Sequence, residues 1–521
     1  MKAPAASAKV KALQPGYDRL ANAQKQEQFL GLLKDHLPEG CEMMEPVTLS
    51  RTDDWENPEA QWDAIAPAVA ACDIIVAQTG IACDDRVLEC AERFGKPITV
   101  SPLAGFSGTI AVAGITSKPG NYEVFACYKW DDLKYRLKIL RARKVIRSTR
   151  ILCVTRFGST TSYSSVDAFN SYEHITNRLG VRFRFINIHE MFDQMTPAVE
   201  GGNPTTPGRK TPDLTEEDLK KANEVVDDLC AGAKENSMTR EKMLPSAIAF
   251  VTVRKNMDLK DCNGFTMPCP DACSTRRLNQ GQFTLCLTHS LNMEEGIPSA
   301  CEYDTDAVLS QQALIAVSGK RPYMGNTCPV PVENGHLITA RFGTTPEQIS
   351  ILEAENPENL YMMQHSVAHR RLRNPDENAP YAIRNFAYDQ GFGVTIRYDF
   401  TADKGQKITM CRFSPDGSKL FIGSGEIVMG GGYEGYNCSQ LVYFRVKDQM
   451  DTWTKQCMAG NHCTMVYGDY VQELKDLALS LGIEPLVADY MEKPRDENFR
   501  PSAAGGAKKG CENTMACHLQ G

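Results

Sequence analysis

The chain has 521 residues, of which 42% are hydrophobic and 23% are charged, and its formal net charge is −8 at pH 7. One hydrophobic core cannot organise so long a chain, so we expect about two to four domains. The composition is that of a globular protein. No tract dense in lysine and arginine with interleaved aromatic residues occurs, which argues against a nucleic-acid partner.

Membrane insertion and export are not expected from the sequence. It contains no run of about 18 apolar residues, and its first twenty residues lack the apolar core of a secretory signal. The 19 cysteines are scattered, many of them within apolar runs. Without an export signal, such cysteines are expected to be buried, reduced thiols. We therefore expect a cytoplasmic protein.

The segment 1–147 alternates between short apolar runs and amphipathic stretches. This pattern predicts a doubly wound, Rossmann-like α/β domain with a parallel sheet. No glycine-rich phosphate-binding motif follows its strands, so a dinucleotide site is not expected. The expected elements are a helix over 17–36, a strand near 42–49, a helix over 58–71, a strand over 72–78, a helix over 81–94, a strand over 97–100 and a helix over 122–147.

The segment 148–328 repeats the alternation and predicts a second doubly wound α/β domain. Arg156 follows its first strand, at the end where ligand-binding groups of open sheets collect. The expected elements are strands over 151–154, 181–188, 247–253 and 282–288, helices over 167–179 and 214–233, and a loop over 196–213 that is rich in proline, glycine and threonine.

The stretch 296–327 closes this second domain. Its apolar residues 297–301 predict a strand that delivers Glu302 at its carboxyl end. Asp304 is suited to cap a helix that begins near Thr305, and Gly319 is suited to end that helix. Glu302 could equally be a solvated loop acid, because most acidic side chains remain exposed.

The pattern changes in the segment 329–490, where short runs of β-branched and aromatic residues alternate with glycine-containing turns. This pattern predicts a mainly antiparallel β-barrel domain with flanking helices. The tail 491–521 is rich in proline, glycine and charge and is expected to be flexible. The expected strands cover 337–342, 360–365, 393–400, 406–413, 419–428 and 440–446, and a last helix covers 470–481.

Three histidines in this third domain are candidates for a metal or substrate site. His462 stands directly before an apolar strand, where it can point into a cavity, although an isolated loop histidine bonded to the backbone is an equal alternative. His365 and His369 have the spacing of two neighbours on one helix face. The residues before His365 predict a strand, so the zinc-binding helix motif does not apply.

The cysteines suggest a second kind of site. Cys269 and Cys273, with Cys286 nearby and Cys262 upstream, could hold a structural zinc ion, although prolines flank Cys269 and no second cysteine pair has the spacing of a zinc ribbon. The tail carries a weaker signal, Cys511 with Cys517 and His518. No local motif supports a cysteine–histidine nucleophilic enzyme.

Several of these strings, taken in order, resemble the L-fucose isomerase family. The most specific is Gly-Ile-Pro-Ser-Ala-Cys-Glu-Tyr-Asp at 296–304, and Ser-Gly-Lys-Arg-Pro at 318–322 and Met-Gly-Asn at 324–326 follow it. The resemblance continues through His365 and His369 to His462 and spans most of residues 70–485. It implies three domains, two α/β layers and a barrel-containing third, assembled as a homo-oligomer that we expect to be a trimer or hexamer. It also implies interconversion of an aldose and a ketose through an enediol, with a divalent metal ion, usually Mn²⁺, held by two carboxylates and a histidine.

The resemblance also implies roles for individual residues. Glu302 matches the first carboxylate and His462 the histidine, while Asn326 stands where the second carboxylate is expected. Glu302 and Asn326 are therefore the expected catalytic residues, and with His462 the expected metal ligands. The expected substrate contacts are His365, His369 and Arg156.

Asn326 is the departure from the family pattern, because an amide oxygen can bind a cation but cannot act as a base. A neighbouring Glu333, Asp304 or Asp306 could substitute for the missing carboxylate. Alternatively, the chain catalyses a related lyase or epimerase reaction on a modified sugar, or binds a sugar without turning it over.

Overall fold

The computed structural model describes residues 8–16, 19–50, 59–80, 84–120, 122–155, 170–195, 213–269, 280–337, 344–354 and 358–488. The chain forms two compact units. One contains Ile146–Lys475 and the described part of Ile483–Met491, and the other contains the described residues up to Val145 together with Asp476–Gly482. The predicted second domain lies in the first unit, as does the predicted third domain except for Asp476–Gly482. The predicted tail 491–521 and the loop over 196–212 fall outside the described residues.

The smaller unit is built on a parallel sheet with the order β2-β1-β4-β5-β6, with β3 also paired to β1. The chain winds outward from β1 in both directions, which is the doubly wound arrangement predicted for this α/β segment, although the central strand β1 itself was not predicted. The strands are β1 (Ala8–Gly16), β2 (Cys41–Met43), β3 (Val47–Ser50), β4 (Ile74–Ala77), β5 (Ile98–Val100) and β6 (Val124–Ala126). The helices are α1 (Arg19–Asp35), α2 (Ala60–Ala71), α3 (Asp84–Phe94), α4 (Phe106–Thr116) and α5 (Trp130–Arg147), and a short 3₁₀ helix, η1, covers Pro102–Ala104.

Two predictions for this unit are corrected. The helix expected over 122–147 begins only at Trp130, because the preceding residues form β6 at the edge of the sheet and pair with β5. Helix α4 was not predicted, since glycine and β-branched residues give it low intrinsic helix propensity. It forms because Ala111 and Ile115 are buried in the core of the unit, which outweighs propensity.

The larger unit begins with a second parallel sheet, of order β11-β10-β7-β8. Its strands are β7 (Arg150–Thr155), β8 (Arg182–Asn187), β10 (Gly264–Thr266) and β11 (Ser299–Ala300). Again the chain winds outward from its first strand, β7, in both directions. The accompanying helices are α6 (Tyr172–Leu179), α7 (Ile188–Met195), α8 (Glu216–Gly232), α9 (Arg240–Leu259), α12 (Cys286–Glu294) and α13 (Thr305–Ser318).

Two strands predicted for this part of the chain are wrong. Residues 247–253 lie inside α9, and residues 286–288 begin α12. Both helices are buried on several sides, so their apolar runs lack the one-sided periodicity of a surface helix. A short apolar run of this kind cannot be distinguished from a buried strand by its pattern.

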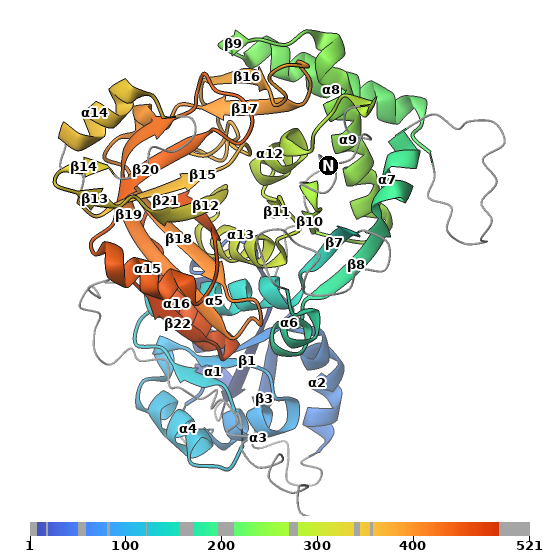
Figure 1. The fold of residues 1–521 in the computed structure, drawn as a ribbon. Helices are drawn as coiled ribbons and strands as arrows, with labels where there is room; N and C mark the ends of the chain where they lie inside the picture. The colour runs from blue at the N-terminus through green and yellow to red at the C-terminus, as the bar shows by residue number, and fades with distance from the viewer. Residues whose placement is uncertain are drawn as a thin grey trace, which may run out of the picture. The chain divides into compact units, whose positions relative to one another are not determined.

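The third layer is a large mixed sheet with the order β18-β21-β12-β15-β20-β19-β22, drawn in yellow and orange in Figure 1. Neighbouring strands are antiparallel except for β19 and β22, and β19 also pairs with β18. The series of pairings therefore returns to its first strand. The strands are β12 (Tyr323–Pro329), β15 (Leu360–Gln364), β18 (Lys407–Phe413), β19 (Lys419–Gly431), β20 (Leu441–Arg445), β21 (His462–Tyr467) and β22 (Glu484–Val487).

Not every predicted strand of the third domain joins this sheet. The strand expected over 393–400 is β17 (Val394–Tyr398), which pairs with β16 (Tyr381–Asn385) in a separate sheet that also contains β9 (Glu235–Asn236). The strand expected over 337–342 lies mostly outside the described residues. The remaining elements are the hairpin β13 (Val332–Glu333) and β14 (His336–Leu337), the helices α14 (Pro346–Ala354), α15 (Gln449–Cys457) and α16 (Val471–Leu481), and the 3₁₀ helix η2 (Phe400–Asp403).

Helix α13 connects the parallel sheet to the large mixed sheet. It packs against β10 and β11 of the first and against β18 and β21 of the second. The predicted boundaries are confirmed: the side chain of Asp304 accepts a hydrogen bond from the backbone N–H of Ala307 at 2.9 Å, and Gly319 ends the helix with φ of 69°. Because α13 is buried along almost its whole length, its start fixes the residues just before it.

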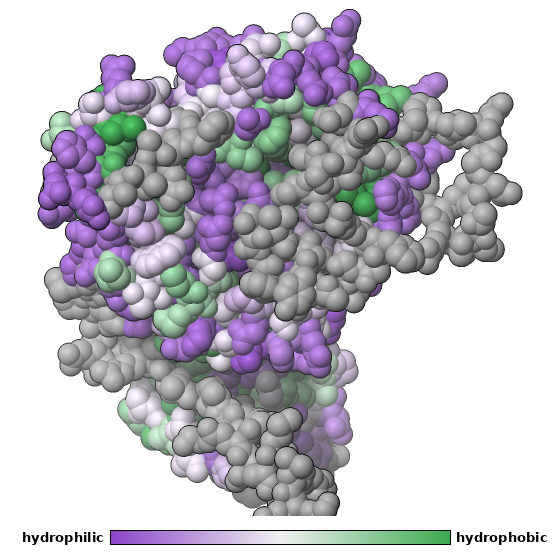
Figure 2. Space-filling model, viewed as in Figure 1, coloured by the Kyte–Doolittle hydropathy of each residue, from purple (hydrophilic) through white to green (hydrophobic). Residues whose placement is uncertain are grey.

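None of the described helices is both long enough and apolar enough to cross a lipid bilayer. On the face drawn in Figure 2, most described side chains are hydrophilic, and hydrophobic ones form only small separate groups. The large apolar side chains instead gather in the cores between the sheets and their helices.

We expect Gly325→Ala to disturb the middle of the large sheet. A Cβ atom at Gly325 lies 2.8 Å from the carbonyl carbon of Gln364, so β12 and β15 must separate. Overpacking of this kind costs about 1–3 kcal/mol. Hydrogen exchange of the β12 and β15 amides measures the loss. Gly114→Ala, where a Cβ meets no atom within 4 Å, is the control and should leave these amides protected. Unchanged exchange in Gly325→Ala contradicts the packing described here.

Candidate functional site

Glu302 lies just beyond the carboxyl end of β11, as predicted. Its backbone is unusual, because Glu302 and Tyr303 have φ of 62° and 61°, in the left-handed region that non-glycine residues rarely adopt. The N–H of Tyr303 donates a hydrogen bond to the carbonyl oxygen of Met267 at 2.9 Å, which holds this turn against the end of the neighbouring strand β10. Strain of this kind persists where the surrounding structure enforces it, and it is frequent at functional sites.

The carboxylate of Glu302 lies between two histidines. Its Oε1 is 3.4 Å from Nε2 of His365, and its Oε2 is 3.1 Å from Nε2 of His462. The two imidazole rings meet edge to face, with centroids 5.5 Å apart. His365 follows β15 and His462 begins β21, the two strands that flank β12. The histidines are 1% and 0% exposed, and Glu302 is 9% exposed, so all three side chains are nearly shielded from bulk water.

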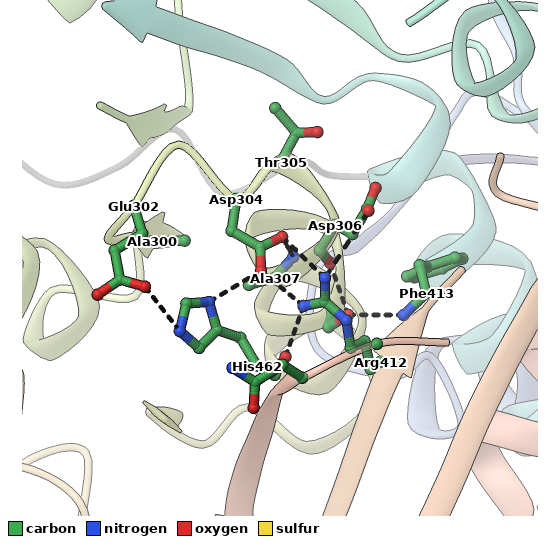
Figure 3. A network of polar contacts seen from close by, with 12 residues as sticks. Ala300, Glu302, Asp304, Thr305, Asp306, Ala307, Arg412, Phe413 and His462 are labelled. Carbon is green, nitrogen blue, oxygen red and sulfur yellow. Dashed lines mark hydrogen bonds and ion pairs between the residues drawn. The ribbon is translucent and has the colours of Figure 1, made fainter. Parts of the chain in front are cut away.

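A buried ionic network fixes the orientation of the His462 ring (Figure 3). Nδ1 of His462 is 3.0 Å from Oδ2 of Asp304, and Nη1 of Arg412 donates a hydrogen bond to the same oxygen at 2.7 Å. Nη1 of Arg412 also donates to the backbone oxygen of His462 at 2.7 Å. Since one ring nitrogen of His462 faces Asp304, the other is directed at Glu302.

The pKa values of the acidic and basic groups in this network are shifted because these groups are buried next to one another. Burial lowers the pKa of His462, but the contacts with Asp304 and Glu302 outweigh it and raise the pKa to about 9. Burial raises the pKa of Asp304, but the charge of Arg412 and the contact with His462 hold that pKa below its ordinary value. Burial beside the ionised Asp304 raises the pKa of Asp306 well above its ordinary value. These shifts favour the ionised form of Asp304 and the protonated form of Asp306.

Asn326 lies beside His462 within the large sheet. It is directly opposite His462 on one side and Gln364 on the other, so the three side chains share one face of the sheet. Its Oδ1 accepts a hydrogen bond from Nδ2 of Asn461. The structure therefore places Asn326 next to His462, with its amide oxygen bonded to a neighbour.

The predicted substitutes for a second carboxylate have other positions. Asp304 contacts His462 rather than facing Glu302, and Asp306 lies 3.9 Å from Arg412 on the side away from His462 (Figure 3). Glu333 is exposed in the β13–β14 hairpin. Glu302 is therefore the carboxylate that the described residues place between the two histidines.

His369 does not join this group, contrary to the prediction. Its Nε2 is 3.0 Å from the carbonyl oxygen of Pro322, and its Nδ1 accepts a hydrogen bond from the N–H of Arg371. Burial lowers its pKa to about 4, so the ring is neutral and both nitrogens serve the backbone. Its spacing from His365 is not helical, because both lie in the loop after β15. Arg156 lies outside the described residues.

Only part of the predicted zinc grouping lies within the described residues. Cys269 lies beside His289 and Cys301. The thiol of Cys286 accepts a hydrogen bond from the hydroxyl of Ser366. The contacts with Cys301 and His289 hold the pKa of the Cys269 thiol well below its ordinary value. Cys273, Cys511, Cys517 and His518 lie outside the described residues, and Cys262 contacts the backbone oxygen of Lys260.

Two functional partners were not predicted from the sequence. Arg412 lies among the apolar residues Met410, Cys411 and Phe413 of β18, and that position was itself a signal, because a charged side chain inside a strand is buried only with a partner. His289 directly follows the strand predicted over 282–288, and the structure places it inside α12 instead, so the direction of its side chain could not be inferred.

Comparison of the chain with family models and with curated proteins gives no match. The resemblance to the L-fucose isomerase family therefore stays a prediction that rests on the motifs quoted above.

We expect Asp304→Asn and Asp306→Asn to differ sharply in stability. Asparagine can still cap α13, but it leaves Arg412 as a buried charge without its ionised partner, which costs about 3–5 kcal/mol. Burial favours the neutral form of Asp306, so its amide replacement should cost less than about 1 kcal/mol. Chemical denaturation measures both free energies. Equal losses in the two variants contradict the assigned protonation states.

The stability of the metal-free protein should fall as pH rises above neutrality. The pKa of His462 is raised from 6.5 to about 9, so its protonated form stabilises the fold fully below 6.5 and loses this effect as pH approaches 9. Denaturation midpoints between about pH 6.5 and pH 8 in the presence of a chelator test this expectation. Buried thiols also contribute at alkaline pH, so the diagnostic quantity is the difference from His462→Gln, which should lack the His462 part of the slope. Parallel pH profiles for the two proteins contradict the expectation.

Proposed function

We propose that the chain is a metal-dependent sugar isomerase that interconverts an aldose and a ketose. The observation that carries this proposal is the position of the Glu302 carboxylate, 3.4 Å and 3.1 Å from Nε2 of His365 and His462. All three groups are nearly buried, and Asp304 and Arg412 hold one of them in place. The resemblance to L-fucose isomerases supplies the reaction class.

The donor atoms fit a divalent metal ion. One carboxylate and two imidazoles form a set of oxygen and nitrogen donors that suits first-row divalent ions, including the Mn²⁺ implied by the resemblance. Nε2 of His365 is buried and makes no hydrogen bond to a described residue, but Nδ1 of the same ring accepts a hydrogen bond from the N–H of Ser366 at 3.0 Å, so an ion bound at Nε2 must displace the proton that the neutral ring carries there. The contact of Asp304 with Nδ1 of His462 is the arrangement that commonly orients a ligating histidine. Bound there, the ion would polarise the carbonyl group of the sugar.

The protein's own groups can move the protons of an isomerisation. Conversion of an aldose to a ketose removes a proton from C2 and returns it to C1, while the hydroxyl proton on O2 is transferred to O1. Glu302 is the described carboxylate able to accept and return the carbon proton. We assign transfer of the hydroxyl proton to an imidazole, because the amide of Asn326 cannot act as a base. In this proposal a carboxylate and a histidine replace the two carboxylates of the family pattern.

The same site could serve a related reaction, and one observation favours that second candidate. Asn326 stands beside His462 with its oxygen bonded to Asn461, so the second acid of the family pattern is missing from its expected place. An epimerase or lyase that needs only one carboxylate base is compatible with this arrangement.

We also propose that the large sheet is the predicted β-barrel. The additional pairing of β18 with β19 supports closure, because it connects the two strands that otherwise end the series of antiparallel pairings. The predicted trimer or hexamer and the predicted cytoplasmic location are further proposals, the first resting on the resemblance and the second on the composition and sequence.

Deuterium exchange tests the proposed reaction. The full-length protein, stripped with a chelator and reloaded with Mn²⁺, is incubated in D₂O with a panel of pentoses, 6-deoxyhexoses and hexoses. We expect deuterium at the carbon next to the carbonyl of at least one sugar, together with formation of its ketose. Glu302→Gln should lower this rate by about 10²–10⁴-fold, as expected for loss of a general base.

Matched variants separate catalysis from folding in this experiment. Glu347→Gln, an exposed exchange of the same type in α14, should retain the full rate. A product other than the ketose indicates the epimerase or lyase reaction. Sugar binding by calorimetry without any exchange, unaffected by Glu302→Gln, contradicts an enzymatic role.

A further inference from the structure

A second cluster of donor atoms lies next to Glu302 and plays no part in the proposed isomerisation. It consists of the thiols of Cys269 and Cys301 and the imidazole of His289. Strands β10 and β11 are parallel neighbours, and Cys269 and Cys301 follow their carboxyl ends, so both thiols reach the same edge of the sheet. His289 comes from α12, whose residues are buried along the whole helix.

The three donor atoms converge on one point. Sγ of Cys269 is 3.5 Å from Nε2 of His289, and both lie within 4.8 Å of Sγ of Cys301. His289 is 0% exposed and Cys301 is 4% exposed, while Cys269 is half-buried. Separations of this size let three ligands surround a single ion at typical bond lengths of about 2.0–2.3 Å.

The imidazole of His289 is held in a fixed orientation. Its Nδ1 is 2.9 Å from the hydroxyl oxygen of Ser299, which also accepts a hydrogen bond from Nδ2 of Asn292 at 3.2 Å. The ring stacks on Phe265, with centroids 5.4 Å apart and an interplanar angle of 27°. Both contacts direct Nε2 toward the thiols. A ring anchored through one nitrogen, with the other facing sulfur atoms, is characteristic of ligating histidines.

We propose that Cys269, His289 and Cys301 bind a thiophilic divalent cation of the zinc type. Binding replaces the two thiol protons with one metal ion, so the filled site is electrically neutral with a neutral imidazole. Neutrality suits a buried position, where net charge is costly. With three protein ligands, the fourth tetrahedral position remains for a water molecule or a ligand oxygen.

This site and the site of Glu302 differ in chemical preference although they share one peptide unit. Cys301 and Glu302 are consecutive, and the thiol of Cys301 also lies within 4.8 Å of the donor atoms of Glu302 and His365. Sulfur donors favour soft or borderline ions, whereas a carboxylate with imidazoles accepts harder ones. A zinc ion on Cys301 therefore fixes the residue directly before the left-handed backbone of Glu302.

Cobalt titration of the reduced, metal-free, full-length protein under anaerobic conditions tests the proposal. Thiolate coordination gives Co²⁺ an intense charge-transfer absorption that carboxylate and imidazole ligands do not give. We expect this absorption to saturate at one equivalent in the wild-type protein and to disappear when zinc is added. Cys269→Ser and Cys301→Ser should abolish it, and His289→Gln should weaken Co²⁺ binding by at least about 10-fold.

Two controls make the outcomes distinct. Cys411→Ser alters a buried thiol that already contacts the oxygens of Ser310 and Thr464, so serine is tolerated there and the absorption should persist. Glu302→Gln, which removes the proposed catalytic carboxylate, should also retain it. Failure of the isomerase proposal and failure of this one are therefore separable.

Three results overturn the proposal. The first is absence of the charge-transfer band in protein whose thiols are all titrated as free. The second is a band lost in Cys301→Ser but kept in Cys269→Ser and His289→Gln, which places the ion on Cys301, Glu302 and His365 instead. The third is a Cys269–Cys301 disulfide in freshly purified protein, because those sulfurs are then unable to act as thiolate ligands.

Discussion

The buried ionic contact between Asp304 and Arg412 is the interaction on which the rest of the site depends. Arg412 is 1% exposed, so its charge is tolerable only beside an ionised partner. Asp304 supplies that partner while also holding Nδ1 of His462 and capping α13. The contact therefore connects the parallel sheet, the helix that follows it and the large mixed sheet. Without this contact, the carboxylate of Glu302 and the imidazole of His462 would not be held in a fixed position relative to each other.

The candidate site combines rigidity with a strained backbone. His462 is fixed through its Asp304 contact and by its place at the start of β21, and Glu302 is fixed in a left-handed conformation. Such a conformation is costly for glutamate, and the burial of the surrounding helix and strands offsets that cost. Precise placement of a carboxylate between two imidazoles is the benefit, because proton transfer and metal binding both depend strongly on geometry.

Features that depend on neighbouring residues in the sequence could be predicted, whereas features that depend on contacts between distant segments could not. The start and end of α13 and the placement of Glu302 were predictable, because a cap residue, a terminal glycine and a strand end are local signals. The convergence of His365 with Glu302 and the bonding of His369 to the backbone were not, because both depend on strand pairings between distant segments. The apolar run of α9 was taken for a strand, since a helix buried on most sides loses its periodicity. Arg412 shows what was missed, because a charged residue among the apolar residues of a strand indicates a partner without identifying it.

Because Asp304 contacts three different groups, folding and the binding of an ion or substrate are linked. Its Oδ1 accepts the capping hydrogen bond of α13, and its Oδ2 accepts from Arg412 and contacts His462. The histidine is therefore oriented only after the helix has begun at the correct residue and the two sheets have come together. An ion or substrate that needs this histidine discriminates against partly folded chains, and by mass action it stabilises the fully assembled unit alone. Binding of the ligand would then favour only those chains in which the Asp304 carboxylate already makes all three of its contacts.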